Sequence, residues 1–300
     1  MSTMGGKMTT SRDELQGLVE EYLEALVRRR PDDLPLSDDV KFTENGQRLP
    51  LDRGLWGTAT AEPPVGRAVT VTDPDSGQAG FFGAVSEHGR PVLFGLRLRA
   101  EASRISEVET LVVRGHSRFQ LFEPESMSTP RAHFDQLIEP SKRSSRAELI
   151  DVADHYFDGI ERDDGSIIPV RSGSVRFENG VQTVRRPSAG GGAFSEGSHM
   201  EVGDQISSGM FAYIERIRDR RYPVIDTERG LIIGLIFFEH PGLLTSVEVK
   251  GVGSVELPEF ATVPSSAFIM ELFKIEQGQI TAIEAMLDFF PYGMRSGWDE

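Results

Sequence analysis

The stretch SRDELQGLVEEYLEAL (residues 11–26) carries the strongest sign of the architecture, because the chain repeats its pattern as SRAELIDVADHYFDGI at residues 145–160. In both stretches apolar residues fall at i, i+3, i+4, i+7, i+8 and i+11, the spacing of one apolar stripe on an amphipathic helix. Ser11 and Ser145 are each followed three residues later by a glutamate, which is the capping-box pattern of a helix start. We therefore predict two equivalent helices.

Two further stretches recur in the same order. Glu44-Asn45-Gly46 returns as residues 178–180, again at an offset of 134, and residues 98–109 resemble residues 273–284 at an offset of 175. The second copy must therefore hold 41 extra residues between positions 180 and 273. Three ordered matches predict that the chain contains two copies of one unit.

The later part of each copy has the pattern of β-strands. Residues 92–99 alternate, with Val92, Phe94, Leu96 and Leu98 on one face. The second copy has Gly278 available for a hairpin turn with positive φ. A helix followed by a run of antiparallel strands predicts the α+β class and argues against a doubly wound parallel sheet.

These patterns predict a domain organisation. We expect a disordered N-terminus at residues 1–10, a first domain at 11–115, a surface linker at 116–144 and a second domain with an insertion at 145–300. The Gly- and Ser-rich stretch 186–197 in the second copy predicts a mobile loop.

Composition excludes several classes of function. The formal charge of −15 and the pI of about 4.9 disfavour binding to nucleic acid or to anionic membranes. The absence of cysteine excludes disulfides, thiolate metal sites and cysteine nucleophiles, and fits a reducing compartment. The first ten residues lack the apolar core of a secretory signal, and the longest apolar run, residues 231–238, is too short to span a bilayer. We expect a cytoplasmic protein.

Several short stretches resemble a family of tandem NTF2-like (SnoaL-like) proteins of bacteria and fungi. The first half matches at KFTENGQ (41–47), GLW (54–56) and GFFG (80–83), and the second half at DDGSIIP (163–169), ENGVQ (178–182), SGMF (208–211) and PYG (291–293). The resemblance implies two cone-shaped domains, each with N-terminal helix packed on a curved antiparallel sheet and a pocket at the mouth of the cone. Many members carry a histidine at the position of Phe177, so this chain departs from them there.

The resemblance also implies a type of chemistry. Enzymes of the wider superfamily are mostly cofactor-free isomerases, cyclases, dehydratases, epoxide hydrolases and aldol-type lyases. In them an Asp, Glu or His moves a proton, while Tyr, Asn, Arg or a protonated acid holds the developing oxyanion; other members only bind ligands. This chain has no phosphate loop, dinucleotide fingerprint, nucleophile elbow or zinc-protease motif, so we expect no cofactor.

Glu178 and Asn179 form the first candidate site. A carboxylate followed by an amide can supply a proton acceptor and a hydrogen-bond donor close to one substrate atom. The alternative is that Asn179-Gly180 forms a turn with positive φ between strands. Arg176, two residues earlier, is expected to bind the substrate.

Three further residues are candidate proton-transfer groups. His199 follows the Gly-rich stretch and His240 ends an apolar strand before a turn. Asp288 is a candidate base if it faces the interior of the cone. The alternatives are an exposed loop histidine, a polar strand end and an exposed acid. His199 and Glu201 are too few ligands to predict a metal site, and we expect no metal.

Aromatic residues supply the expected contacts with the substrate. Tyr213 could donate to an oxyanion, Tyr292 closes the last strand, and Trp56 packs in or over the first pocket. The spacing of Tyr213, Arg216 and Arg220 predicts an amphipathic helix over residues 210–221 with solvated arginines.

We therefore predict a cofactor-independent acid–base enzyme of the lyase, isomerase or dehydratase type. It would act on a small apolar or aromatic oxygenated molecule, with the site in the second copy, where the 41 extra residues lie. The alternatives are a small-molecule-binding protein without turnover, and a scaffold in which the two cones pack as a homodimer would. Homo-oligomerisation is left open.

Overall fold

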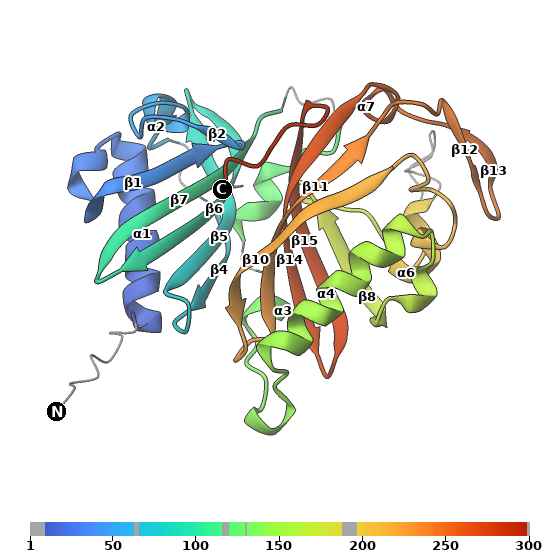
Figure 1. The fold of residues 1–300 in the computed structure, drawn as a ribbon, viewed down its shortest axis with the longest axis horizontal. Helices are drawn as coiled ribbons and strands as arrows, with labels where there is room; N and C mark the ends of the chain where they lie inside the picture. The colour runs from blue at the N-terminus through green and yellow to red at the C-terminus, as the bar shows by residue number, and fades with distance from the viewer. Residues whose placement is uncertain (1–9, 63–65, 116–119, 130, 188–196, 299–300) are drawn as a thin grey trace.

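The computed structural model describes residues 10–62, 66–115, 120–129, 131–187 and 197–298. The chain forms two units that lie side by side, each with one long helix packed on a curved sheet (Figure 1). All but one residue of the predicted disordered N-terminus, 1–10, and most of the predicted mobile loop, 186–197, lie outside the described residues.

The first unit begins with the predicted helix. At the start of α1 (Arg12–Arg28) the Ser11 side chain accepts a hydrogen bond from the Glu14 backbone amide, and the Glu14 side chain accepts one from the Ser11 backbone amide, so the capping box forms. The apolar stripe of α1 is buried against the sheet. The remaining elements are β1 (Leu36–Glu44), β2 (Gln47–Arg48), α2 (Leu55–Thr58), β3 (Ala59–Thr60), β4 (Gly66–Asp73), β5 (Gln78–Glu87), β6 (Arg90–Glu101) and β7 (Arg104–Val113).

The second unit repeats this order with additions. Its helix α4 (Arg146–Glu161) starts at the same kind of capping box, between Ser145 and Glu148. The other elements are β8 (Val170–Glu178), β9 (Val181–Gln182), α6 (Val202–Ile206), β10 (Arg216–Asp226), β11 (Leu231–His240), β12 (Ser246–Val249), β13 (Gly253–Glu256), α7 (Glu259–Thr262), β14 (Ser265–Glu276) and β15 (Gln279–Pro291).

The two larger sheets have equivalent topology. The first runs β2-β1-β7-β6-β5-β3 with β4 also on β5, and the second runs β10-β11-β14-β15-β8-β9. Within each path the pairs are antiparallel except for one parallel pair, β1 with β7 and β8 with β15. In these pairs Glu44 lies opposite Thr110 and Glu178 opposite Ala285, so the sequence offsets of 134 and 175 bring equivalent residues to equivalent places. The fold class is α+β, as predicted.

The helix predicted over residues 210–221 is wrong. Residues 216–226 form strand β10, which pairs with β11 from Arg216 opposite Glu239 to Asp226 opposite Leu231. Pro223 is disfavoured within a helix, and the β-branched residues around it favour a strand. Arg220 is not simply solvated either, because it forms ion pairs of 2.7 Å with both Asp158 and Glu161.

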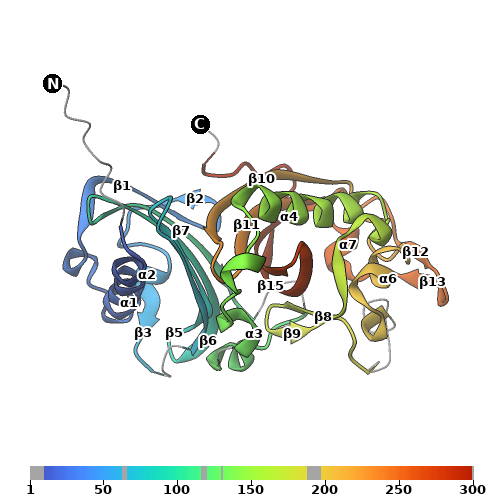
Figure 2. The ribbon, with the colours of Figure 1, turned by 90° about the horizontal axis from the view of Figure 1, so that it is seen from below.

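The two units pack sheet against sheet. In Figure 2 the first sheet curves between α1 and the second unit, so α1 lies on the side away from the interface. Two reciprocal ion pairs join the units: Arg12 with Asp226 at 2.7 Å and Arg146 with Asp73 at 2.8 Å. The arginines are equivalent first residues of α1 and α4, so the contact has the self-complementary form of a two-fold dimer interface. The buried cluster between the sheets includes Val71, Phe82, Leu111, Ile233, Phe237 and Phe268.

The segment between the units does more than connect them. It contains the short helix α3 (Ala132–Asp135), and its Met127 and Phe134 side chains are fully buried in the cluster between the sheets. The expectation of a linker that packs on the surface is therefore corrected, because these two side chains belong to the core.

Asn179 and its counterpart Asn45 tie a turn to the neighbouring strand. Both have positive φ, 47° and 53°. The Asn179 amide group bonds both the N–H and the C=O of Leu287, at 2.9 and 3.0 Å. Asn45 does the same with Val112, at 2.7 and 3.1 Å. The repeated Asn-Gly therefore closes the turn after β1 and β8, as the alternative interpretation of Asn179 predicted.

Asn179→Ala should lower the free energy of unfolding by about 2 kcal/mol, because two buried backbone groups lose their partners and alanine disfavours positive φ. Asn45→Ala should lower it less, since Asn45 is only partly buried and water can replace its bonds. Urea unfolding of both variants tests this. Asn179→Gly separates the causes: full recovery with glycine would show that backbone strain, not hydrogen bonding, sets the effect.

Candidate functional site

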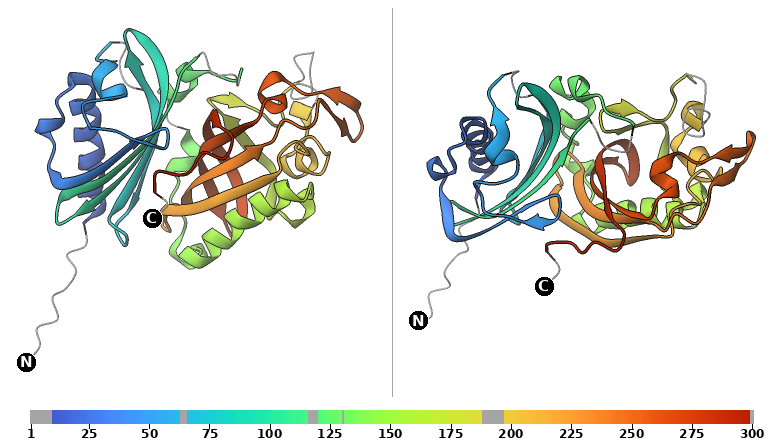
Figure 3. Two further views of the ribbon diagram at one scale, coloured as in Figure 1. Left: turned by 45° about the horizontal axis from the view of Figure 1, so that its top comes forward. Right: turned by 90° about the horizontal axis from the view of Figure 1, so that it is seen from above.

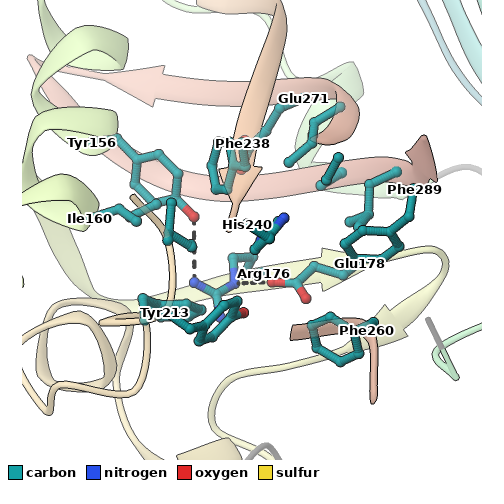
Figure 4. Close-up of a pocket in the computed structure, with 16 residues that line it drawn as sticks. Tyr156, Ile160, Arg176, Glu178, Tyr213, Phe238, His240, Phe260, Glu271 and Phe289 are labelled. Carbon is teal, nitrogen blue, oxygen red and sulfur yellow. Dashed lines mark hydrogen bonds and ion pairs between the residues drawn. The ribbon is translucent and has the colours of Figure 1, made fainter. Parts of the chain in front are cut away.

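A cavity of about 60 Å³ lies in the second unit between α4 and the inner face of the sheet. Figure 4 shows polar side chains from α4 and β8 that meet aromatic side chains from β11, α7 and β15. Ten of the sixteen lining residues are aliphatic or phenylalanine. The polar ones are Tyr156, Arg176, Glu178, Tyr213, His240 and Glu271.

Arg176 organises the polar side of the cavity. Its Nε lies 2.9 Å from Glu178 Oε1 and donates to Thr183 Oγ1 at 3.1 Å. Its two other nitrogens donate to the Tyr156 hydroxyl, at 3.4 Å, and to the Gln205 side chain. The guanidinium is buried, so these contacts replace water around a charge that arginine always keeps. Arg176 therefore holds Glu178 in place at the cavity wall.

Glu271 supplies a protonated acid at neutral pH. It projects from the central strand β14 and is almost completely buried. Burial raises the pKa of the Glu271 carboxyl to about 8, against the lowering influence of Arg176 and of a hydrogen bond with Tyr156. Burial also raises the pKa of the Tyr156 phenol above its usual range, so both groups keep their protons. The cavity thus holds one carboxyl group paired with an arginine, Glu178, and one neutral carboxylic acid, Glu271.

His240 lines the cavity as a neutral imidazole. Burial alone lowers the pKa of His240 to about 4 from an ordinary value of 6.5. Its Nδ1 is buried and has no hydrogen-bond partner among the described residues. A buried polar atom without a partner is uncommon in native proteins and is often found at functional sites.

Four rings form a closed aromatic group around the carboxylate of Glu178 (Figure 4). Tyr213 stacks on His240 at 5.3 Å between centroids, and His240 lies 5.4 Å from Phe289. Phe260 completes the group, at 5.2 Å from Phe289 and 6.2 Å from Tyr213. This side of the cavity suits the apolar part of a ligand.

The structure brings four of the predicted site residues to this cavity: Arg176, Glu178, Tyr213 and His240. The five others lie elsewhere. Asn179 bonds the backbone of Leu287, and His199 is exposed. Asp288 lies on β15 between the lining residues Leu287 and Phe289 and faces away from the cavity. Tyr292 is 47% exposed and bonds Glu215, and Trp56 is buried in the first unit.

Two residues at the cavity were not predicted from the sequence. Glu271 interrupts the apolar run of residues 267–273 in β14, and a charged residue within an apolar run is a signal that could have found it. Tyr156 was assigned only to the apolar stripe of its helix. Its ring does lie in that stripe, but its hydroxyl also accepts a hydrogen bond from Arg176.

Two of the equivalent positions of the first unit are apolar, whereas Glu178 has an acidic counterpart, Glu44. By sheet register Phe42 occupies the place of Arg176, and Leu96 the place of Glu271. Both side chains are buried in the core of the first unit. Trp56 is buried beside Tyr22, the counterpart of Tyr156, and donates to its hydroxyl at 2.8 Å. The first unit therefore builds the same fold without an arginine at the place of Arg176 or an acid at the place of Glu271.

The buried acid predicts a pH-dependent stability. The folded state binds the Glu271 proton up to about pH 8, whereas an unfolded chain releases it near 4.5. The bound proton therefore contributes to the free energy of unfolding, and this stabilisation is fully present below pH 4.5 and is lost as the pH rises through 8. From pH 6 to 8 the native sequence should lose about 2 kcal/mol more unfolding free energy than Glu271→Gln. Urea unfolding at both pH values measures the difference, and parallel pH dependences would contradict the assignment.

The described residues show neither a metal centre nor a membrane span. No group of three or more His, Asp or Glu side chains among them is placed to hold a metal ion. Within the same ranges no helix combines the length and the apolar character that a bilayer crossing requires.

Comparisons with known proteins concern mainly the second unit and the fold. A sequence family described as a domain of unknown function (DUF8021) matches residues 142–287. No curated protein sequence matches the chain.

Three solved structures represent the similar folds. An NTF2-like protein of unknown function from Cytophaga hutchinsonii is 10% identical and covers 33% of this chain and 88% of its own, with a TM-score of 0.26. An LEH-like epoxide hydrolase from M. tuberculosis is 20% identical and covers 33% of this chain and 83% of its own, with a TM-score of 0.26. AusH from Aspergillus nidulans is 12% identical and covers 48% of this chain and 86% of its own, with a TM-score of 0.29. Each unit of this chain has one long helix packed on a curved sheet.

Proposed function

We propose that the second unit is a cofactor-independent acid–base enzyme of the lyase, isomerase or dehydratase type for a small apolar oxygenated molecule. The observation that carries the proposal is the pairing of two carboxyl groups at one cavity. Glu178 forms an ion pair with Arg176, while burial raises the pKa of Glu271 to about 8 and keeps it protonated at neutral pH. Two acids whose environments separate their protonation states can act as base and acid in one reaction.

The reaction follows from these two states. Glu178 removes a proton from the carbon next to the substrate's oxygen-bearing carbon, and the electron pair moves onto that oxygen. The Glu271 carboxylic acid donates a hydrogen bond to the developing oxyanion. Return of the proton to a different carbon completes an isomerisation, whereas loss of a neighbouring hydroxyl as water completes a dehydration.

The remaining polar residues position this pair. Tyr156 bonds both Arg176 and Glu271, and so links the base side of the cavity to the acid side. Tyr213 and His240 are proposed to contact the substrate from the aromatic side. The other predicted site residues, Asn179, His199, Asp288, Tyr292 and Trp56, have no role in this proposal because they lie outside the cavity.

The proposal places catalysis in the second unit and packing in the first. Phe42 and Leu96, the first-unit counterparts of Arg176 and Glu271, cannot move protons. The carboxylate of Glu44, the counterpart of Glu178, instead accepts from the Leu55 amide at 2.7 Å and lies 3.5 Å from Arg114. We infer that the chain is a tandem protein in which one copy kept a site and the other became its structural partner. Its sheet faces are already paired within the chain, so a homo-oligomer would use another surface.

Ligand binding without turnover is the second candidate function. It is favoured by the mostly apolar lining and by the hydrogen-bond partners that already surround Arg176. A binder needs the cavity and its aromatic group, but it does not need Glu271 to stay protonated.

The test begins with native mass spectrometry of protein purified from its own host, followed by a thermal-shift screen of small ketones, enones and hydroxy-ketones. Each stabilising compound is then incubated with the protein in D₂O and followed by NMR. Deuterium incorporation or product formation supports the enzyme. Binding with no exchange and no product in any of these compounds supports the binder.

A further inference from the structure

The wall that carries Phe260 has no counterpart in the first unit. There, β5 and β6 are joined by a turn of two residues, 88–89, whereas the connection from β11 to β14 spans residues 241–264. This longer connection contains the hairpin of β12 and β13, which projects at the end of the molecule away from the first unit (Figure 3), and the single turn α7. Phe260 is the one cavity-lining residue that comes from it.

Most of the other lining residues are held more firmly than α7. Glu178, His240, Glu271 and Phe289 sit on strands of one continuous sheet, fixed by ladder hydrogen bonds on one or both sides. Tyr156 belongs to α4, which is 16 residues long. α7 has four residues and no side-chain cap at its start. A side chain on so short a turn can be replaced without disturbing the ladder that positions the polar residues.

The size and charge of the cavity restrict what it can hold. About 60 Å³ is well under the roughly 150 Å³ of an apolar cavity that admits benzene. Near neutral pH the charges of Arg176 and Glu178 cancel, and Glu271 and His240 are neutral. An ion placed here would lose its water without meeting an unpaired opposite charge.

We propose that Phe260 sets the upper size limit of this cavity, so that it takes uncharged oxygenated molecules smaller than a six-membered ring and rejects larger ones. The ring of Phe260 packs between Tyr213 and Phe289 and closes the aromatic group. Truncating it joins the volume of one phenyl ring to the cavity beside the Arg176–Glu178 pair. The inference uses the site of the proposed function, but it concerns size and charge and does not require turnover.

The experiment measures binding of phenol, benzoate and benzylammonium to the full chain by isothermal titration calorimetry at pH 7. Phe260→Ala should bind phenol at least tenfold more tightly than the native protein, and neither ion should gain. Phe289→Ala is the matched control, because it removes the neighbouring ring, 5.2 Å from Phe260, from strand β15 and not from α7. Phe260→Leu serves as the second variant if alanine impairs folding, which urea unfolding checks.

Unchanged phenol affinity in the folded Phe260 variant, an equal gain in Phe289→Ala, or an equal gain for the ions would each overturn the proposal. The outcome is separable from that of the proposed function. A phenol gain with no proton exchange in any protein supports the size limit and argues against the enzyme. Exchange on small ketones with no change in size preference in Phe260→Ala supports the enzyme and overturns the size limit.

Discussion

Glu178→Gln should lower kcat for a substrate of the second-unit cavity by about 10²- to 10⁴-fold, the usual contribution of a positioned proton-transfer group. Glutamine keeps the shape and can still contact Arg176, whose Nε lies 2.9 Å from the native carboxylate. It cannot accept the proton, however. KM should change little because the aromatic group that holds the apolar part of the substrate stays in place. Steady-state kinetics on the compound found in the exchange screen measures both constants.

Asp288→Asn is the matched control for this loss. Asp288 lies on β15 between the lining residues Leu287 and Phe289, so its carboxylate faces away from the cavity. The same change of charge should therefore leave kcat within about twofold, a difference of less than 0.5 kcal/mol in the barrier. Retention of activity in Glu178→Gln, or an equal loss in Asp288→Asn, would show that Glu178 is not the base.

The triple variant Arg176→Phe with Glu178→Leu and Glu271→Leu should keep the fold and lose the site. It removes both members of the ion pair together, and at positions 176 and 271 it gives the second unit the residues that the first unit already has, Phe42 and Leu96. Replacing buried charged or polar groups together by apolar ones is often neutral or stabilising by about 1 to 4 kcal/mol. We expect unfolding free energy that is unchanged or raised, with ligand binding and turnover abolished.

The single variant Arg176→Phe should instead be destabilised by about 3 to 5 kcal/mol, because the buried Glu178 carboxylate loses the guanidinium that it pairs with. Urea unfolding of the native protein, Arg176→Phe and the triple variant measures the contrast. A triple variant that is less stable than Arg176→Phe alone would mean that the polar set supports the fold, which would weaken the view that it is retained for function.

The failures of sequence-based prediction have physical causes. Arg216 and Arg220 show a helical spacing, yet residues 216–226 pair with β11 as a strand. Pro223 disfavours a helix, and the β-branched residues beside it favour a strand. Glu178 was the first candidate for the base, and Asp288 was a further candidate if it faced the interior of the cone. A strand alternates its faces, so one residue of register decides that Glu178 lines the cavity and Asp288 does not.

What the sequence by itself determined is the plan of the two units. Ser11 and Ser145 with their glutamates start equivalent helices, and the two Asn-Gly pairs close equivalent turns. These features act within a few residues or repeat along the chain, so they can be recognised without a structure. Tertiary structure alone decided the site. Glu271 is far in sequence from Arg176 and Glu178, and only the folded sheet brings the three side chains to one cavity. The raised pKa of Glu271 depends on burial that the folded sheet and α4 create.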